Sequence, residues 1–208
     1  MLHFENDLSI WIPHEFPDQI FDIYKNELNA PELKLDIRKT PPRGPYNMIE
    51  WAIPTLIGMY IFKTYFDTFL KEMAKEHYKI LSGWLKKTAN DSRSIKVTTV
   101  TAAESTQKIN KSNTQSRVFS IKSTTNTGIN ITFLFDESLN NEQWASAIDK
   151  LLNILELHFM NGKTDELTLQ IAQNGLESSI YAKIKSDNGD WEFLSLKTLM
   201  TSQKSDLS

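Results

Sequence analysis

Few residues in this chain have side chains suited to catalysis. The sequence holds four histidines and no cysteine, which excludes disulfides, thiolate metal sites and a cysteine nucleophile. His14 and Asp136 each follow a predicted strand, where a loop can carry a catalytic group. A helix-entry turn accounts for His14 without catalysis. The sequence therefore assigns no catalytic residue, and these two are the candidates if the chain is an enzyme.

Pairs of acidic residues raise the question of a bound cation. Such pairs occur at Asp136-Glu137, at Asp165-Glu166, and at Asp187 and Asp190 in a predicted hairpin turn. The oxygens of a D-x-x-D turn can face a cation, but two carboxylates are too few ligands without help from other loops. Acidic turns also keep a surface soluble. We expect no metal ion.

The common cofactor and catalytic motifs are missing. The chain contains no G-x-G-x-x-G, no G-x-x-x-x-G-K-[ST], no H-E-x-x-H and no G-x-S-x-G. We expect no cofactor. His77 falls on the apolar stripe of the long predicted helix, and His158 lies near the end of the later predicted helix. We expect both to be packed or partly exposed structural histidines.

Composition and charge narrow the class of partner. The 208 residues suffice for one well-packed domain or two small ones. The net charge of −3 argues against nucleic acid, because domains that bind it are usually basic. The first residues lack the cationic start and apolar stretch of a secretory signal, so we expect a cytoplasmic protein. Frequent Lys, Asn and Ile without cysteine are also associated with bacterial proteins.

The N-terminal half predicts a β-α-β opening followed by a long helix. Alternating apolar residues predict strands at 8–12 and 33–37, on either side of an amphipathic helix at 16–28. Three prolines and a glycine at 40–47 then break the chain. Apolar residues every three or four positions predict a helix from 47 to 87. It begins near residue 53 if Pro54 lies in its first turn, or it is kinked there.

The C-terminal half predicts mostly strands. We expect strands at 95–100, 117–124, 128–135, 167–171, 179–184 and 191–196, with a helix at 140–159. The fold class is therefore α+β: a β-α-β opening, one long amphipathic helix, then a mostly antiparallel sheet with one further helix. Residues 1–100 and 117–200 are two regions joined by a polar linker at 101–116, with a frayed tail at 201–208. The two regions can also form one continuous domain.

These patterns favour a non-catalytic protein-interaction module of regulatory, adaptor or inhibitory type. The long helix carries more aromatic side chains than a small sheet needs, so we expect it to contact a protein partner or a second copy in a homo-oligomer. The expected contact residues are Arg43, Tyr60, Tyr65, Phe66, Phe69, Tyr78 and Trp84.

Two alternatives remain open. Residues 48–70 include a twelve-residue apolar run at 51–62 with a basic continuation, which favours a membrane-acting effector at a membrane surface. Pro54 and Asp67 interrupt that segment. The second alternative is an enzyme whose dispersed residues, His14 and Asp136, meet only in the folded chain.

Overall fold

The computed structural model describes residues 6–14, 19–40, 57–95, 114–161, 165–173, 179–185 and 188–199. The side chains of residues 19–21, 68–75 and 161 are not described. The strands are β1 Leu8–Pro13, β2 Leu35–Thr40, β3 Ile57–Ile61, β4 Gln115–Thr124, β5 Asn130–Asp136, β6 Ser179–Ile184 and β7 Trp191–Leu194. The helices are α1 Gln19–Leu28, α2 Leu70–Ser92, α3 Asn141–Asn161 and α4 Glu166–Gln173, with a π-helical turn η1 Tyr65–Phe69 before α2.

All seven strands belong to one mixed sheet in the order β2-β1-β3-β4-β5-β6-β7. It includes strands from both regions that the sequence suggested. The pairs β1·β2, β3·β4 and β5·β6 are parallel, and the pairs that join them are antiparallel. Helices and a mixed sheet confirm the α+β class. The β-α-β opening is also confirmed, because β1 and β2 are parallel neighbours joined through α1.

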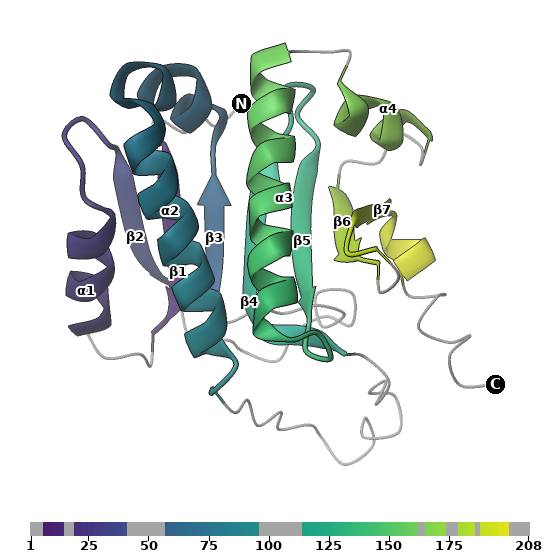
Figure 1. Cartoon of the computed structure of the whole chain (residues 1–208), viewed down its shortest axis with the longest axis horizontal. Coiled ribbons are helices and arrows are strands. Elements are labelled where there is room, and N and C mark those ends of the chain that lie inside the picture. The colour runs from purple at the N-terminus through teal and green to yellow at the C-terminus, as the bar shows by residue number, and fades with distance from the viewer. Residues whose placement is uncertain are drawn as a thin grey trace.

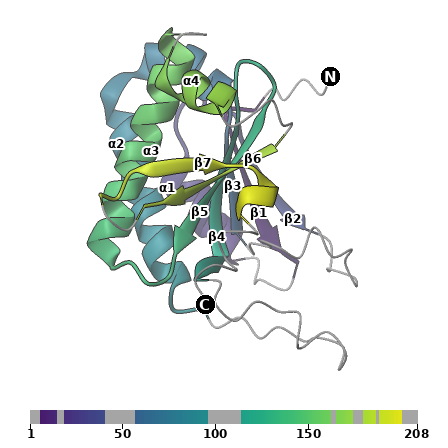
Figure 2. The ribbon, with the colours of Figure 1, turned by 90° about the vertical axis from the view of Figure 1, so that its right-hand side faces the viewer.

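Three helices cover one face of this sheet. Figure 1 shows α1, α2 and α3 side by side in front of the strands, and Figure 2 shows them on one side of the sheet. The apolar side chains that alternate along each strand point into the space between the two layers. The buried residues from the strands include Leu8, Ile10, Ile12, Met59, Ile121, Phe133, Ala182 and Phe193.

The two long helices are tied to each other and to the turn that starts α2. Phe66 in η1 stacks on Phe159 in α3, with ring centroids 5.2 Å apart. Ser82 donates a hydrogen bond to Asp149 at 2.9 Å, and Lys86 forms an ion pair with the same carboxylate. The helix layer is therefore fixed by contacts from the turn before α2 and from the second half of α2.

The three crossovers do not share one hand. β1 and β5 run in the same direction. In the sheet order, however, β2 comes before β1 whereas β6 comes after β5, so the two connections move across the sheet in opposite directions. Because α1 and α3 cover the same face, the first and third crossovers have opposite hands. The β3-α2-β4 crossover is right-handed (Figure 1) and shares its hand with the first. The β5-α3-α4-β6 crossover is therefore left-handed, which is rare among parallel connections.

Two predicted elements are wrong. Residues 57–61 form the buried strand β3 and not the first half of a helix, so the long helix comprises α2 from residue 70 to 92. Residues 167–171 are helical in α4 and not a strand, because this helix buries Leu167 and Ile171 one turn apart. The predicted hinge at 40–47, the strand at 95–100, the linker at 101–116 and the tail at 201–208 lie mostly or wholly outside the described residues.

Two buried tryptophans differ in one hydrogen bond and provide a matched test of the core. Trp144 donates its indole N–H to the Asp136 carbonyl at 2.7 Å and packs under the Arg93 guanidinium. Trp84 is equally buried, but its Nε1 has no acceptor among the described residues. We expect Trp144→Phe to lower the free energy of unfolding by about 2–3 kcal/mol and Trp84→Phe by about 1 kcal/mol. Urea titration of both variants measures the difference, and equal losses would contradict it.

Candidate functional site

The sheet face opposite the helices carries polar and aromatic side chains in register. One row across the strands is Arg38, Trp11, Gly58, Ser120, Leu134, Lys183 and Glu192. The next row is Asp36, Ser9, Tyr60, Lys122, Thr132, Tyr181 and Leu194. A helical turn at 196–199 covers the β5–β7 end, where Leu199 packs with Leu134 and Leu194. Among the described residues, no helix covers the β2–β4 end.

Trp11 is held in one orientation at the β2–β4 end of this face. Its indole N–H donates to Ser9 Oγ at 3.0 Å, and the Ser9 hydroxyl donates to Asp36 Oδ2 at 3.3 Å. The same carboxylate forms an ion pair with Arg38. The indole is 36% exposed, while its single polar atom is satisfied within the chain. The ring faces are therefore the part of Trp11 that a ligand can contact.

Tyr60 and Lys122 extend the surface that Trp11 begins. The Trp11 and Tyr60 ring centroids lie 4.9 Å apart, with the planes tilted by 39°. Lys122 Nζ lies 5.3 Å from the centroid of the Tyr60 ring, within cation–π range. These contacts join β1, β3 and β4. We call Trp11, Tyr60 and Lys122 the aromatic platform.

The charges of this face largely neutralise one another. Asp36 pairs with Arg38, and Lys183 pairs with Glu192 at 3.6 Å. For Lys122, no carboxylate of the described residues lies within ion-pair distance. Within the described residues, this face therefore offers the aromatic rings of Trp11 and Tyr60 beside the ammonium group of Lys122.

The structure distributes the predicted contact residues over different places. Tyr65, Phe66 and Trp84 are buried in the core and contribute no exposed surface to the long helix. Their aromatic rings pack within the chain, with Phe66 on Phe159 and Trp84 edge-on to Tyr24. The remaining residues are also separated: Tyr60 belongs to the aromatic platform, Tyr78 is half-buried on α2, and Arg43 and the Phe69 side chain lie outside the described part of the structure.

His77 joins three elements in the core. Its Nε2–H donates to the Leu28 carbonyl at 3.2 Å, so its Nδ1 accepts the Tyr65 hydroxyl at 3.1 Å. Burial lowers the pKa of His77 below its ordinary value of 6.5, and the carbonyl opposes that shift. Burial also raises the pKa of Tyr65. His77 is a neutral link between η1, α1 and α2.

His158 and Asp165 form a hydrogen-bonded pair that resembles the histidine and aspartate of a catalytic triad. His158 Nδ1 donates to Asp165 Oδ2 at 2.8 Å, and both side chains are buried. However, His158 Nε2 accepts the Asn126 backbone N–H at 3.1 Å. Asp165 also caps α4 by accepting the Thr168 N–H, and these hydrogen bonds outweigh burial and lower the Asp165 pKa. Because both nitrogens of His158 are occupied, the pair anchors the β4–β5 turn and α4.

The two candidate catalytic residues do not meet. His14 and Asp136 stand at the same end of the sheet, but β3 and β4 lie between their strands, which separates them by roughly 14 Å. Asp136 accepts hydrogen bonds from Gln115 and from the backbone and hydroxyl of Ser138. The carboxylate of Asp136 thus closes the β5–α3 turn.

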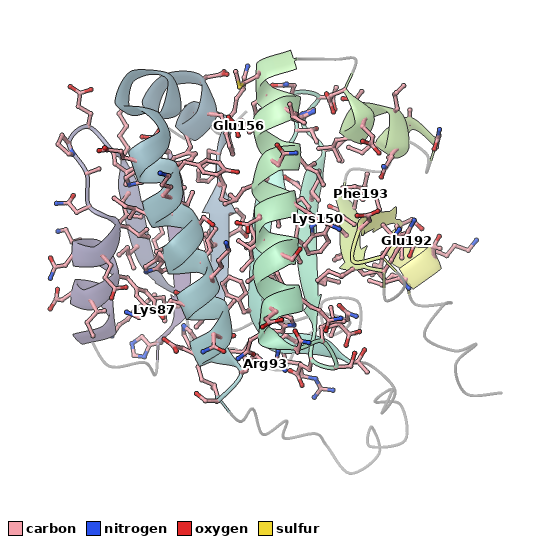
Figure 3. All side chains as sticks on the ribbon, viewed as in Figure 1. Lys87, Arg93, Lys150, Glu156, Glu192 and Phe193 are labelled. Atoms are coloured by element: carbon pink, nitrogen blue, oxygen red, sulfur yellow. The ribbon has the colours of Figure 1, made fainter. Side chains whose placement is uncertain are left out.

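A lysine supplies the positive charge at the predicted acidic turn. Lys150 Nζ donates to the carbonyls of Asn188 and Gly189 at 3.1 Å each, and to Asp190 at 2.6 Å. Figure 3 shows Lys150 reaching from α3 toward β6 and β7. Asp187 lies outside the described residues. Within the described ranges, no three His, Asp or Glu side chains come together as metal ligands.

Comparisons with family models, curated proteins and solved structures find no match for this chain. None of the helices in the described ranges is both long and apolar enough to cross a bilayer.

The sequence contains a signal for Trp11 that catalytic and cofactor motifs do not include. In the segment Leu8–Pro13, the apolar residues Leu8, Ile10 and Ile12 alternate with Ser9 and Trp11. A tryptophan on the polar side of an amphipathic strand is a large ring placed away from the core. That pattern alone indicates an exposed aromatic surface.

His77 makes stability depend on pH in a predictable direction. Above pH 6.5 the histidine is neutral in both folded and unfolded chains, so its contribution is complete. As the pH falls below 6.5 toward the lower folded pKa, His77 becomes protonated in the unfolded chain but stays neutral in the folded chain. The free energy of unfolding therefore decreases. We expect the titration of His77 to lower the free energy of unfolding by up to about 1.4 kcal/mol for each pH unit of acidification.

His77→Gln removes this titration and keeps a donor for the Leu28 carbonyl. Urea unfolding of both proteins between pH 7 and pH 5 should show a smaller loss of stability on acidification for the variant. Parallel losses in the two proteins would contradict the assignment.

Proposed function

We propose that this chain is a non-catalytic protein-interaction module that binds a segment of another protein on the sheet face opposite the helices. The observation that carries the proposal is the exposed Trp11 ring, held by Ser9 and extended by Tyr60. Tryptophan and tyrosine are enriched among the residues that dominate binding energy. Because Trp11 is already oriented, its side chain loses less conformational entropy when a partner stacks on it.

The charge pattern favours a protein over a nucleic acid. Phosphate backbones are bound by several cations in line, each of which releases counterions. Here Arg38 and Lys183 are paired with carboxylates, and the chain as a whole carries a net charge of −3. Lys122 suits a single acidic group. We therefore propose a partner segment that places an apolar or aromatic side chain on Trp11 and a carboxylate near Lys122.

The long helix has a different role in this proposal from the one its aromatic content suggested. Tyr65, Phe66 and Trp84 serve the core, and the exposed aromatic surface belongs to β1 and β3. β3 comes from the apolar run that suggested a membrane contact, and its residues Ile57, Met59 and Ile61 are buried in the core. This placement favours a protein partner over a membrane surface.

A peptide-display selection tests the proposal without knowledge of the natural partner. Random peptides are selected on the wild-type protein, and the enriched peptides are measured by fluorescence anisotropy against purified variants. We expect enriched peptides to carry an aromatic or bulky apolar residue near an acidic one. Trp11→Ala should weaken their binding by roughly tenfold or more, and Lys122→Glu should weaken it in a salt-dependent way.

Leu169→Ala is the matched control, because Leu169 is also a large exposed apolar residue but lies on α4. Circular dichroism verifies that each variant is folded. Peptides that bind Trp11→Ala as tightly as wild type would overturn the proposal. So would preferential, Trp11-dependent binding of single-stranded oligonucleotides, measured in parallel with the peptides.

A further inference from the structure

The outward face of α2 carries a stripe of four exposed residues. Glu76, Ile80, Gly83 and Lys87 follow one another at spacings of four, three and four residues and are all exposed. The opposite face of the helix, with Leu81 and Leu85 fully buried, packs on the sheet. We call Glu76, Ile80, Gly83 and Lys87 the outer stripe.

Two residues of the outer stripe are unfavourable for an isolated molecule. Ile80 is 48% exposed, although it sits among polar positions. Gly83 lies in the middle of a 23-residue helix, where glycine costs stability relative to alanine. A Cβ at Gly83 would meet no atom within 4 Å, and Gly83 is not among the residues with positive φ. Neither crowding nor backbone conformation within the chain accounts for glycine at this position.

We infer that the outer stripe is the contact between two copies of this chain, packed antiparallel about a two-fold axis between Leu81 and Ser82. That axis places Ile80 of each copy opposite Gly83 of the other, because both residues are equally distant from it. The Ile80 side chain of one copy then packs over Gly83 of the other, which has no side chain. Interlocking of a large and a small residue allows helices to approach closely.

The same axis brings opposite charges together. Glu76 and Lys87 are also equally distant from it, so each Glu76 faces the Lys87 of the second copy. The stripe is therefore complementary to itself in both shape and charge, as a two-fold interface requires. A partner of different sequence would not need this internal symmetry, which is why a second copy is the occupant.

Lys87 already has a carboxylate neighbour within its own chain. It forms an ion pair with Glu27 of α1, which raises the Lys87 pKa. Figure 3 shows Lys87 on the part of α2 nearer its C-terminal end, on the side facing α1. An ammonium group has three donors, so Lys87 can donate a hydrogen bond to a second carboxylate from the other copy. The Glu27 pair also fixes the side chain in position for it.

This dimer would leave the aromatic platform accessible. The outer stripe lies on the helix layer, and the platform lies on the opposite face of the sheet (Figure 2). A dimer would therefore present two platforms facing away from each other. The inference does not depend on the proposed function, since it rests on different residues.

The test uses two charge-reversed variants, alone and mixed. Glu76→Lys alone sets two lysines opposite each other at both ends of the stripe, and Lys87→Glu alone sets two glutamates there. When the two variants are mixed, each end of the stripe regains one lysine and one glutamate. We expect the apparent mass of the wild-type protein in sedimentation velocity to rise with concentration toward twice 24.0 kDa. Each variant alone should associate at least roughly tenfold more weakly, and the mixture should regain association.

Matched controls separate this effect from a general change of charge. Glu142→Lys on α3 and Lys25→Glu on α1 make the same changes at exposed positions off the stripe, and both should associate like wild type. Gly83→Gln should remain folded and monomeric, because its side chain fills the position that Ile80 of the second copy needs. Circular dichroism verifies the fold of each variant.

Three results would overturn the inference: a wild-type monomer over a roughly hundredfold concentration range, association that either single variant leaves unchanged, or a mixture that remains monomeric. The Trp11→Ala variant should dimerise like wild type. Failure of the dimer and failure of peptide binding are therefore separate outcomes.

Discussion

The packing of every long helix against the same sheet face is the constraint on which the rest of this structure depends. β1 and β3 alternate buried apolar residues with serine, glycine or aromatic residues, so the apolar side of these strands needs cover from the helices. α1, α2 and α3 provide that cover (Figure 1). On the other face, Leu134 and Leu194 are covered by the helical turn at 196–199. Concentrating the core between two layers leaves the β2–β4 end of the opposite face without a helix among the described residues. The aromatic platform is a consequence of this one-sided arrangement.

The left-handed crossover follows from the same constraint. The β4–β5 hairpin occupies one side of β5, so β6 can add only on the other side. A right-handed connection in that direction would carry α3 over the opposite face. On that face α3 would lose the stacking of Phe159 on Phe66 and the hydrogen bond from Ser82 to Asp149. The shared core of α2 and α3 therefore outweighs the usual preference for a right-handed connection.

Polar side chains, buried ones at His77 and His158 and a partly exposed one at Lys150, fix how the elements meet at their ends. His77 links α2 to η1 and to the end of α1, while His158 links α3 to the β4–β5 turn and, through Asp165, to α4. Lys150 fastens the β6–β7 turn to α3. Each group has its partners within the chain, as buried polar atoms require. Residue types associated with catalysis and cation binding are used here to hold the fold together.

The sequence by itself determined the α+β class, the β-α-β opening, the amphipathic helix α3 and the placement of Trp11 opposite the apolar side of β1. These follow from local periodicity, which needs no partner. The tertiary structure decided that 57–61 is a strand and 167–171 a helix, because short apolar runs fit either form and only their neighbours select one. It also decided that Tyr65, Phe66 and Trp84 are core, while Tyr60 and Lys122 join Trp11. A strand's period shows which residues share a face, but only pairing across the sheet brings three strands together at one site.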